Sequence, residues 1–214
     1  MRWVVVVPVK RLIHAKSRLG AGTRRRELAL AFLRDTVAAA LACDTVGAVG
    51  VVTGDPDVAT TLAGDGAIPI DDAPEAGINP ALRHAASLLA ESHRGFAVAA
   101  LAGDLPALRT GELADALAEA SGHRRAFVCD TSGTGTTLVT AGPGSTLDPR
   151  FGPRSRAAHR ASGAVELDGG WPSLRRDVDT VVDLADARRL GVGEATANVL
   201  RAIDHAEEAQ GTGP

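Results

Sequence analysis

Short apolar runs alternate along the chain with longer amphipathic, alanine-rich segments. This alternation is typical of βαβ units that wrap around a parallel sheet. The first run, residues 3–7, is valine-rich and unbroken, which predicts a strand buried on both faces. Further strands are predicted at residues 46–53, 67–70, 96–102, 127–130, 136–140 and 175–179. Helices are predicted at residues 23–42, 79–91 and 110–120, after Gly54-Asp55-Pro56, and twice beyond Thr180.

The pattern predicts the α/β class: a single Rossmann-like domain with a mostly parallel central sheet and helices on both faces. A chain of 214 residues has the size of one such domain. We assign residues 1–206 to this domain and residues 207–214 to a polar C-terminal tail. In open parallel sheets, ligands bind at the carboxyl ends of the strands. We therefore expect one site built from the loops that follow Val7, Thr53, Ala102 and Asp179.

Composition removes several partners from consideration. The formal net charge is −3, and aromatic residues make up 3% of the chain, with no tyrosine. The chain therefore lacks both the excess positive charge and the aromatic side chains that nucleic-acid binding typically uses. No run approaches the roughly 18 apolar residues of a membrane span, and the order of apolar and charged residues at the start is wrong for a secretory signal. Cys43 and Cys129 are interpreted as buried or idle thiols of a cytoplasmic protein, and the six histidines as surface or core residues.

The choice of basic residues points to a phosphate site near the start of the chain. Only two of the 23 basic residues are lysines, Lys10 and Lys16, and both follow the first predicted strand. Lysine is a compact point charge, whereas arginine is a rigid planar fork, so a lysine pair suits nucleotide phosphates. With Arg11 and Arg18 they place four cations within nine residues, although no glycine-rich phosphate motif is present. The alternative is chance retention of two solvated lysines.

Carboxylates at predicted strand ends are candidates for binding a divalent cation. Asp104 directly follows the apolar strand at residues 96–102. Asp177 and Asp179 flank Val178 with strand period two, so both acids face the same side. Magnesium is typically held by one or two carboxylates together with substrate phosphates and water. The alternatives are a turn-capping role for Asp104 and an ordinary solvated strand face for the pair.

Three further loops carry small, polar or basic residues. Asn79, in Gly77-Ile78-Asn79-Pro80, is either a helix N-cap or an amide that faces a nucleotide. Residues 133–137 and 150–155 form hydroxyl-bearing loops whose backbone N–H groups could bind an anion. The arginines between residues 150 and 160 either raise the local positive potential or belong to a solvated basic helix.

Taken together, these segments resemble one known family. The resemblance rests on P-V-K-R-L-x-x-A-K-S-R-L, G-I-N-P-A-L, G-D-L-P-A-L, G-T-G-T-T, R-F-G-P-R-S and D-V-D-T, in that order from Arg2 to about Thr196. The chain resembles the phosphoenolpyruvate/2-phospho-L-lactate guanylyltransferases of coenzyme F420 biosynthesis, which have a MobA-like nucleotidyltransferase fold. Its alanine- and arginine-rich composition resembles the actinobacterial members, for which phosphoenolpyruvate is the implied acceptor.

The resemblance implies a role for particular residues. It makes Asp104, Asp177 and Asp179 metal ligands, and Lys16 and Asp104 catalytic residues. It implies nucleotide binding by Lys10, Lys16, Gly77 and Asn79. It implies phosphoenolpyruvate binding by Thr136, Gly152 and Ser155. Ile78-Asn79-Pro80 departs from the family pattern, in which Leu-Asn is more often followed by a residue other than proline. The residue before a proline is pushed away from helical geometry.

The expected reaction is transfer of GMP from GTP to phosphoenolpyruvate with Mg²⁺ as cofactor. The products are enolpyruvyl-diphospho-guanosine and pyrophosphate, with the former handed to the next enzyme of the pathway. One alternative is the same chemistry with 2-phospho-L-lactate, or with another small acceptor. The other is a non-catalytic nucleotide-binding protein, because one fold serves many functions.

Overall fold

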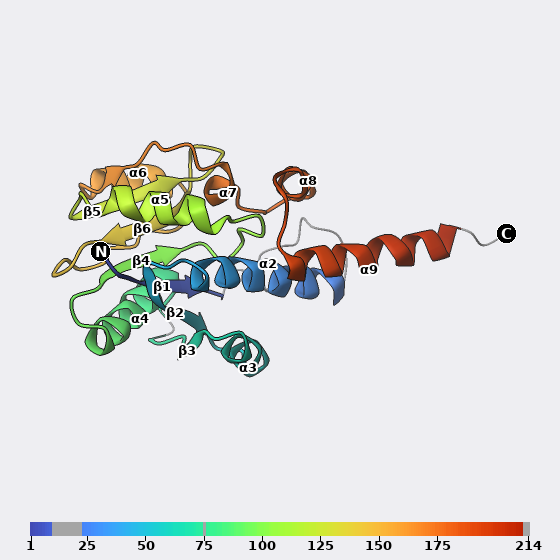
Figure 1. The fold of residues 1–214 in the computed structure, drawn as a ribbon, viewed down its shortest axis with the longest axis horizontal. Coiled ribbons are helices and arrows are strands. Elements are labelled where there is room, and N and C mark those ends of the chain that lie inside the picture. Colours follow the sequence, from blue (N-terminus) through green and yellow to red (C-terminus); the bar gives the residue numbers. More distant parts are fainter. Residues whose placement is uncertain (10–22, 75, 212–214) are drawn as a thin grey trace.

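The central sheet places its strands so that chain segments far apart in sequence meet at one edge. The computed structural model describes residues 1–9, 23–74 and 76–211. Within these ranges, seven strands form one sheet in the order β3-β2-β1-β4-β6-β5-β7 (Figure 1). They are β1 (Trp3–Pro8), β2 (Val46–Thr53), β3 (Ile68–Asp71), β4 (Ala97–Leu101), β5 (Arg125–Cys129), β6 (Thr136–Ala141) and β7 (Val165–Glu166). Neighbouring strands are parallel except at β6, which runs antiparallel to β4 and β5.

Helices cover both faces of this sheet, as the sequence predicted. They are α2 (Thr23–Leu41), α3 (Pro56–Gly64), α4 (Ile78–Ser92), α5 (Thr110–Ala120), α6 (Ser155–Ala161), α7 (Pro172–Arg175), α8 (Val181–Leu190) and α9 (Glu194–Gly211). Strand β1 is buried along its whole length because its side chains alternate between two cores. Val5 and Val7 pack in the core that contains residues of α2, α3 and α5. Val4 and Val6 pack on the other face with residues of α4. The predicted α/β class is confirmed.

The strand predicted at residues 175–179 is wrong. Helix α7 ends at Arg175, and the sheet is completed instead by the two-residue strand β7. The alternation that suggested a strand is nevertheless present, because Val178 is fully buried and Asp179 is exposed. The Val178 N–H donates to the carbonyl of Asp104 at 3.0 Å. This segment is therefore fixed against the loop after β4.

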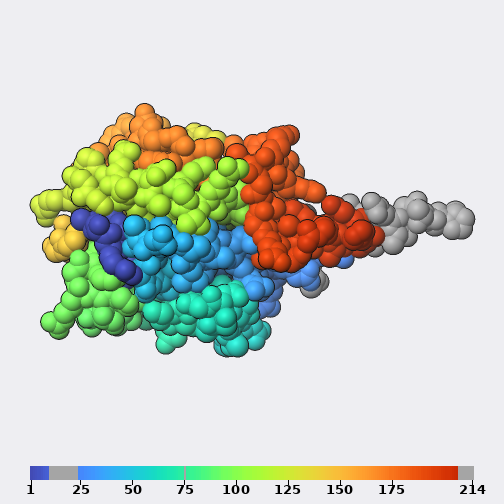
Figure 2. All heavy atoms as spheres, viewed as in Figure 1, coloured from blue at the N-terminus to red at the C-terminus, as the bar shows by residue number. Residues whose placement is uncertain are grey.

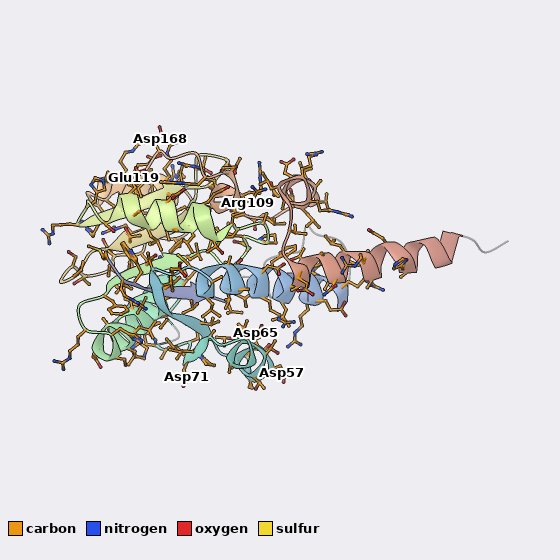
Figure 3. The ribbon with its side chains drawn as sticks, viewed as in Figure 1. Asp57, Asp65, Asp71, Arg109, Glu119 and Asp168 are labelled. Carbon is orange, nitrogen blue, oxygen red and sulfur yellow. The ribbon has the colours of Figure 1, made fainter. Side chains whose placement is uncertain are left out.

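The last two helices close one end of the domain over α2. Figure 2 shows the first part of α9 lying against α2. Ala187 of α8 belongs to the same buried apolar cluster as Leu28 and Phe32 of α2. Asp35 of α2 accepts hydrogen bonds from the N–H groups of Ala195 and Thr196, at 2.9 and 2.8 Å, and so caps the start of α9. Arg109, labelled in Figure 3, donates to the carbonyl of Leu190 at the end of α8. These hydrogen bonds hold the end of α8 and the start of α9 against the rest of the domain.

A capping box is present at the start of α8. The Thr180 hydroxyl accepts from the Asp183 N–H at 3.2 Å, and the Asp183 carboxylate accepts from the Thr180 N–H at 2.9 Å. Helix α9 continues to Gly211, beyond the domain boundary predicted at residue 206, and that boundary stays a prediction. Among the described helices, none combines the length and the apolar character that a bilayer crossing needs.

Candidate functional site

The candidate site lies at the edge of the sheet where β4 ends and β6 begins. Strand order reverses between β1 and β4, and this kind of switch point is where open α/β sheets bind ligands. Because β6 is antiparallel to β4, its first residues lie at the same edge as the last residues of β4. The Ala102 N–H donates to the Thr137 carbonyl at 2.7 Å. This bond places the loop that carries Asp104 beside the start of β6.

The loop after β4 is held from two sides. The Leu105 N–H donates to the Thr36 hydroxyl oxygen at 3.1 Å, and that hydroxyl donates to the Phe32 carbonyl at 2.8 Å. On the other side, the Gly193 N–H donates to the Pro106 carbonyl at 2.8 Å. Helix α2 and the segment before α9 therefore fix the backbone next to Asp104.

Three aspartates lie close enough to Asp177 to repel its negative charge. The contact between Val178 and Asp104 brings Asp177 to the end of β4. Burial and, after it, the negative charges of Asp104, Asp130 and Asp179 raise the pKa of Asp177 to about 7. The sequence predicted that Asp104, Asp177 and Asp179 would come together, and the structure brings them together. Their role as metal ligands stays a prediction.

Asp130 is the member of this group that the sequence analysis missed. It follows β5 directly, as Asp104 follows β4, so the same signal was available. Its carboxylate accepts hydrogen bonds from the Thr134 N–H at 2.9 Å and the Ser132 hydroxyl at 2.8 Å. A Cβ at Gly135 would lie 2.4 Å from the carboxylate, so any other residue there would displace Asp130. The loop of residues 133–137 therefore fixes the position of the Asp130 carboxylate.

A cavity of about 720 Å³ reaches this acidic group from the side of β5. Its wall includes Asp130, Trp171, Arg175 and Arg176. The Arg175 guanidinium also donates to the carbonyls of Cys129 and Leu167, at 3.2 and 3.0 Å, which ties this wall to the end of β5. Asp130 is therefore the member of the acidic group that lines this cavity.

The acidic group has the chemistry of a divalent cation site. Oxygen donors suit magnesium, which commonly takes only one or two carboxylates and completes its shell with water and phosphate oxygens. A cation would also relieve the repulsion that raises the pKa of Asp177. In the ranges that the structure describes, no three histidine, cysteine or acidic side chains are arranged as a ready metal cage. An ion that shares its ligands with a phosphate substrate needs fewer protein ligands than such a cage.

A second cluster, of hydroxyl groups and one histidine, is built around the start of β6. The Ser155 hydroxyl donates to the Thr136 hydroxyl oxygen at 3.1 Å, and His159 Nδ1 lies 3.0 Å from the same oxygen. Gly152 has φ 141°, a backbone conformation that favours glycine. The Ser155 N–H donates to the Gly152 carbonyl at 3.1 Å. Thr136, Gly152 and Ser155 are thus joined, as predicted, while their contact with an acceptor stays a prediction.

Asn79 has a different structural role from the helix cap that was one alternative. Helix α4 begins at Ile78, and Gly77, with φ 105°, is its N-cap. The Asn79 amide donates to the Phe151 carbonyl at 3.0 Å and accepts from the Phe151 N–H at 2.8 Å. The side chain thus links the start of α4 to the loop of Gly152. Nucleotide contacts by Gly77 and Asn79 stay predictions, and Lys10 and Lys16 lie outside the described residues.

Ion pairs offset part of the positive charge predicted around α6. Glu166 pairs with both Arg156, at 2.8 Å, and Arg160. Asp148 pairs with Arg150 at 3.0 Å. The anion-attracting potential expected from these arginines is therefore reduced by carboxylates that the sequence pattern did not connect with them.

The sheet order and the acids at the β4 edge define the class of protein as an α/β nucleotidyltransferase fold. A protein of Desulfovibrio desulfuricans G20 described as a nucleotide-diphospho-sugar transferase aligns with a TM-score of 0.67 and 17% identity over 96% of both chains. Rv0371C of Mycobacterium tuberculosis H37Rv, solved in complex with manganese, aligns with a TM-score of 0.53 and 20% identity. The second alignment covers 89% of this chain and 97% of that one. These similarities support the fold.

Sequence similarity is far more specific. The model of the family described as "Guanylyl transferase CofC like" matches residues 3–210, and the chain belongs to this family. A phosphoenolpyruvate guanylyltransferase of Salinispora arenicola is 54% identical over 200 residues, which cover 91% of this chain and 92% of that protein. The family resemblance drawn from the sequence motifs is confirmed.

Proposed function

We propose that this protein is a phosphoenolpyruvate guanylyltransferase, which transfers GMP from GTP to phosphoenolpyruvate. One structural observation carries the chemistry: Asp104 and Asp177, more than 70 positions apart in the chain, meet through the Val178–Asp104 hydrogen bond. The hydroxyl groups of Thr136 and Ser155 lie along the same sheet edge. An acidic cation site beside an anion-accepting hydroxyl pair suits two phosphorylated substrates. Family membership and the name of the 54% identical relative support the same activity.

The reaction is an in-line displacement at the α-phosphorus of GTP. A phosphate oxygen of phosphoenolpyruvate forms the new P–O bond, the bond to the bridging oxygen of the β-phosphate breaks, and pyrophosphate leaves with the bonding electrons. Because the nucleophile is already an anion, no general base is required. The enzyme's contribution is alignment of the two substrates and reduction of their mutual repulsion.

Each group of residues has one task in this scheme. Asp104, Asp177 and Asp179 hold a divalent cation, proposed as Mg²⁺, which neutralises phosphate charge and stabilises the leaving group when bound. Thr136, Gly152 and Ser155 hold the phosphate of the acceptor. The segments of Lys10, Lys16, Gly77 and Asn79 bind GTP, with the lysines supplying positive charge. The manganese complex of the distant Rv0371C structure is consistent with divalent metal use in this fold.

The product of this reaction is enolpyruvyl-diphospho-guanosine, and we place it in coenzyme F420 biosynthesis on the basis of the family. We expect the reaction to occur in the cytoplasm, where the free thiols of Cys43 and Cys129 are stable. Handover of the product to the next enzyme of the pathway is part of the same proposal.

Product analysis tests the proposed function directly. The purified protein is incubated with Mg²⁺ and each of GTP, CTP, UTP and ATP, against phosphoenolpyruvate and 2-phospho-L-lactate, and the products are identified by mass. We expect pyrophosphate and enolpyruvyl-diphospho-guanosine from the pair GTP and phosphoenolpyruvate. A product only from 2-phospho-L-lactate would change the acceptor, and nucleotide binding without any turnover would refute the enzymatic function.

A further inference from the structure

We propose that His159 is a positioning residue, which aims the hydroxyl hydrogen of Thr136 at the phosphate of the acceptor. This inference rests on the proposed function, because it takes the loop of Thr136, Gly152 and Ser155 as the acceptor site. It adds a residue that the sequence analysis grouped with the other histidines as surface or core.

The position of the His159 ring is fixed on its sides by two aromatic rings. The side chain is 0% exposed. Its ring stacks on Phe127, with centroids 5.5 Å apart, and meets the edge of Phe151 at 5.8 Å. An imidazole held in this way has little freedom to rotate, so the direction of each ring nitrogen is set by the fold.

The hydrogen bonds of His159 determine which ring nitrogen carries the hydrogen. The Arg150 N–H donates to Nε2 at 2.9 Å, so Nε2 is an acceptor and carries no hydrogen. Burial lowers the pKa of His159 to about 4, so the ring is neutral at physiological pH. The single ring hydrogen is then on Nδ1, and Nδ1 donates to the Thr136 hydroxyl oxygen at 3.0 Å.

The Thr136 hydroxyl is left with one remaining bond to make. Its oxygen accepts from His159 Nδ1 and from the Ser155 hydroxyl, which uses both lone pairs. The hydroxyl hydrogen must therefore point away from His159 and Ser155, toward a further acceptor. A phosphate oxygen is such an acceptor, and hydrogen bonds to a charged group are stronger than neutral ones.

A change of strand register brings Thr136 to this position. Val128 pairs with Leu138, so unbroken antiparallel pairing would place Cys129 opposite Thr137. Cys129 instead pairs with Thr136. A bulge of this kind turns a side chain toward the other face of the sheet and is common next to active sites.

His159 also fixes the loop that leads to Gly152. Its Nε2 holds the backbone N–H of Arg150, while Asn79 holds the N–H and the carbonyl of the next residue, Phe151. The backbone before Gly152 is thus held by side chains from two helices, α6 and α4. His159 therefore orients the Thr136 hydroxyl and holds the backbone before Gly152, both on the acceptor side of the site.

Three substitutions of His159 separate these two bonds. His159→Phe keeps an aromatic ring but removes both bonds. His159→Asn places an amide nitrogen near the position of Nδ1 and restores the donor to Thr136. His159→Gln reaches toward the position of Nε2 and restores an acceptor for Arg150. The matched control is Thr140→Val on the same strand, which removes the buried Thr140 hydroxyl that donates to the Ala126 carbonyl at 3.2 Å.

The readouts are KM for phosphoenolpyruvate, KM for GTP, kcat and the midpoint of thermal unfolding. We expect His159→Phe to raise KM for phosphoenolpyruvate roughly 10- to 100-fold, the range of one lost hydrogen bond to a charged group, with KM for GTP changed less than about threefold. His159→Asn should recover most of this loss and His159→Gln less of it. Thr140→Val should lower thermal stability and leave both KM values unchanged.

The outcomes separate the inference from the proposed function. A wild-type protein that forms no guanylylated phosphoenolpyruvate refutes the proposed function. An active wild-type protein whose three His159 variants retain KM for phosphoenolpyruvate within about twofold, with only thermal stability lowered, refutes the positioning role alone. A larger KM loss for His159→Asn than for His159→Gln also contradicts it, because the Thr136 bond would then not be the one that matters.

Discussion

Asp104→Asn is expected to lower turnover roughly 100-fold or more while the protein remains folded. Asparagine keeps the shape of the side chain but removes the charge that attracts a cation. The backbone contacts of this loop, from Val178 to the Asp104 carbonyl and from Leu105 to Thr36, do not involve the carboxylate. Folding should therefore survive, and pyrophosphate release should report the loss.

Asp57→Asn is the matched control for this substitution. Asp57 is an exposed carboxylate in the first turn of α3, at the β3 side of the sheet (Figure 3). It should keep wild-type pyrophosphate release and a wild-type circular dichroism spectrum. If purified, folded Asp104→Asn also releases pyrophosphate at nearly the wild-type rate, the assignment of Asp104 to the metal site is wrong.

Asp177→Asn is expected to stabilise the metal-free protein and to lower its activity by a similar factor to Asp104→Asn. The folded-state pKa of Asp177 is raised to about 7 by burial and by the neighbouring acids. The ionised side chain therefore destabilises the folded state, and asparagine removes that charge. At pH 7.5 we expect the free energy of unfolding to rise by about 2 kcal/mol, measured by urea titration in the presence of a chelator.

The stability gained by Asp177→Asn should depend on pH. A carboxyl whose pKa is raised on folding opposes folding increasingly as the pH rises from its unfolded value, near 4, to its folded value, about 7. The gain from Asp177→Asn should therefore be small at about pH 4.5 and largest above pH 7. Asp115→Asn, at an exposed position of α5, should show no such trend. An Asp177→Asn protein that is less stable than the wild type at pH 7.5 would show that the acids do not repel one another.

Much of the acidic site was predictable because its residues lie next to buried apolar segments. Asp104 follows the strand at residues 96–102, and Val178 separates Asp177 from Asp179. These local patterns place carboxylates at the sheet edge even where the secondary structure was predicted wrongly, as at residues 175–179. The alternation there reflects one buried valine packed under the site, and it needs no pairing with another strand.

The network of His159 was not predictable from the sequence because it depends on strand register. Thr136 meets His159 only because β5 and β6 shift their pairing after Val128. The sequence contains no turn or glycine that marks this shift within the strands. Asn79 is similar, because its bonds to Phe151 join positions 72 residues apart. Asp130, in contrast, follows a strand and could have been identified by the rule that found Asp104.

The central claim is that Asp104 and Asp177 hold a divalent cation together with the nucleotide. Mn²⁺ accepts the same oxygen ligands as Mg²⁺ and is detected by electron paramagnetic resonance. The most direct measurement is therefore Mn²⁺ binding to the protein in the presence of a non-hydrolysable GTP analogue. We predict that the double substitution Asp104→Asn and Asp177→Asn weakens this binding roughly tenfold or more relative to the wild type. Equal Mn²⁺ affinity of the two folded proteins would contradict the account.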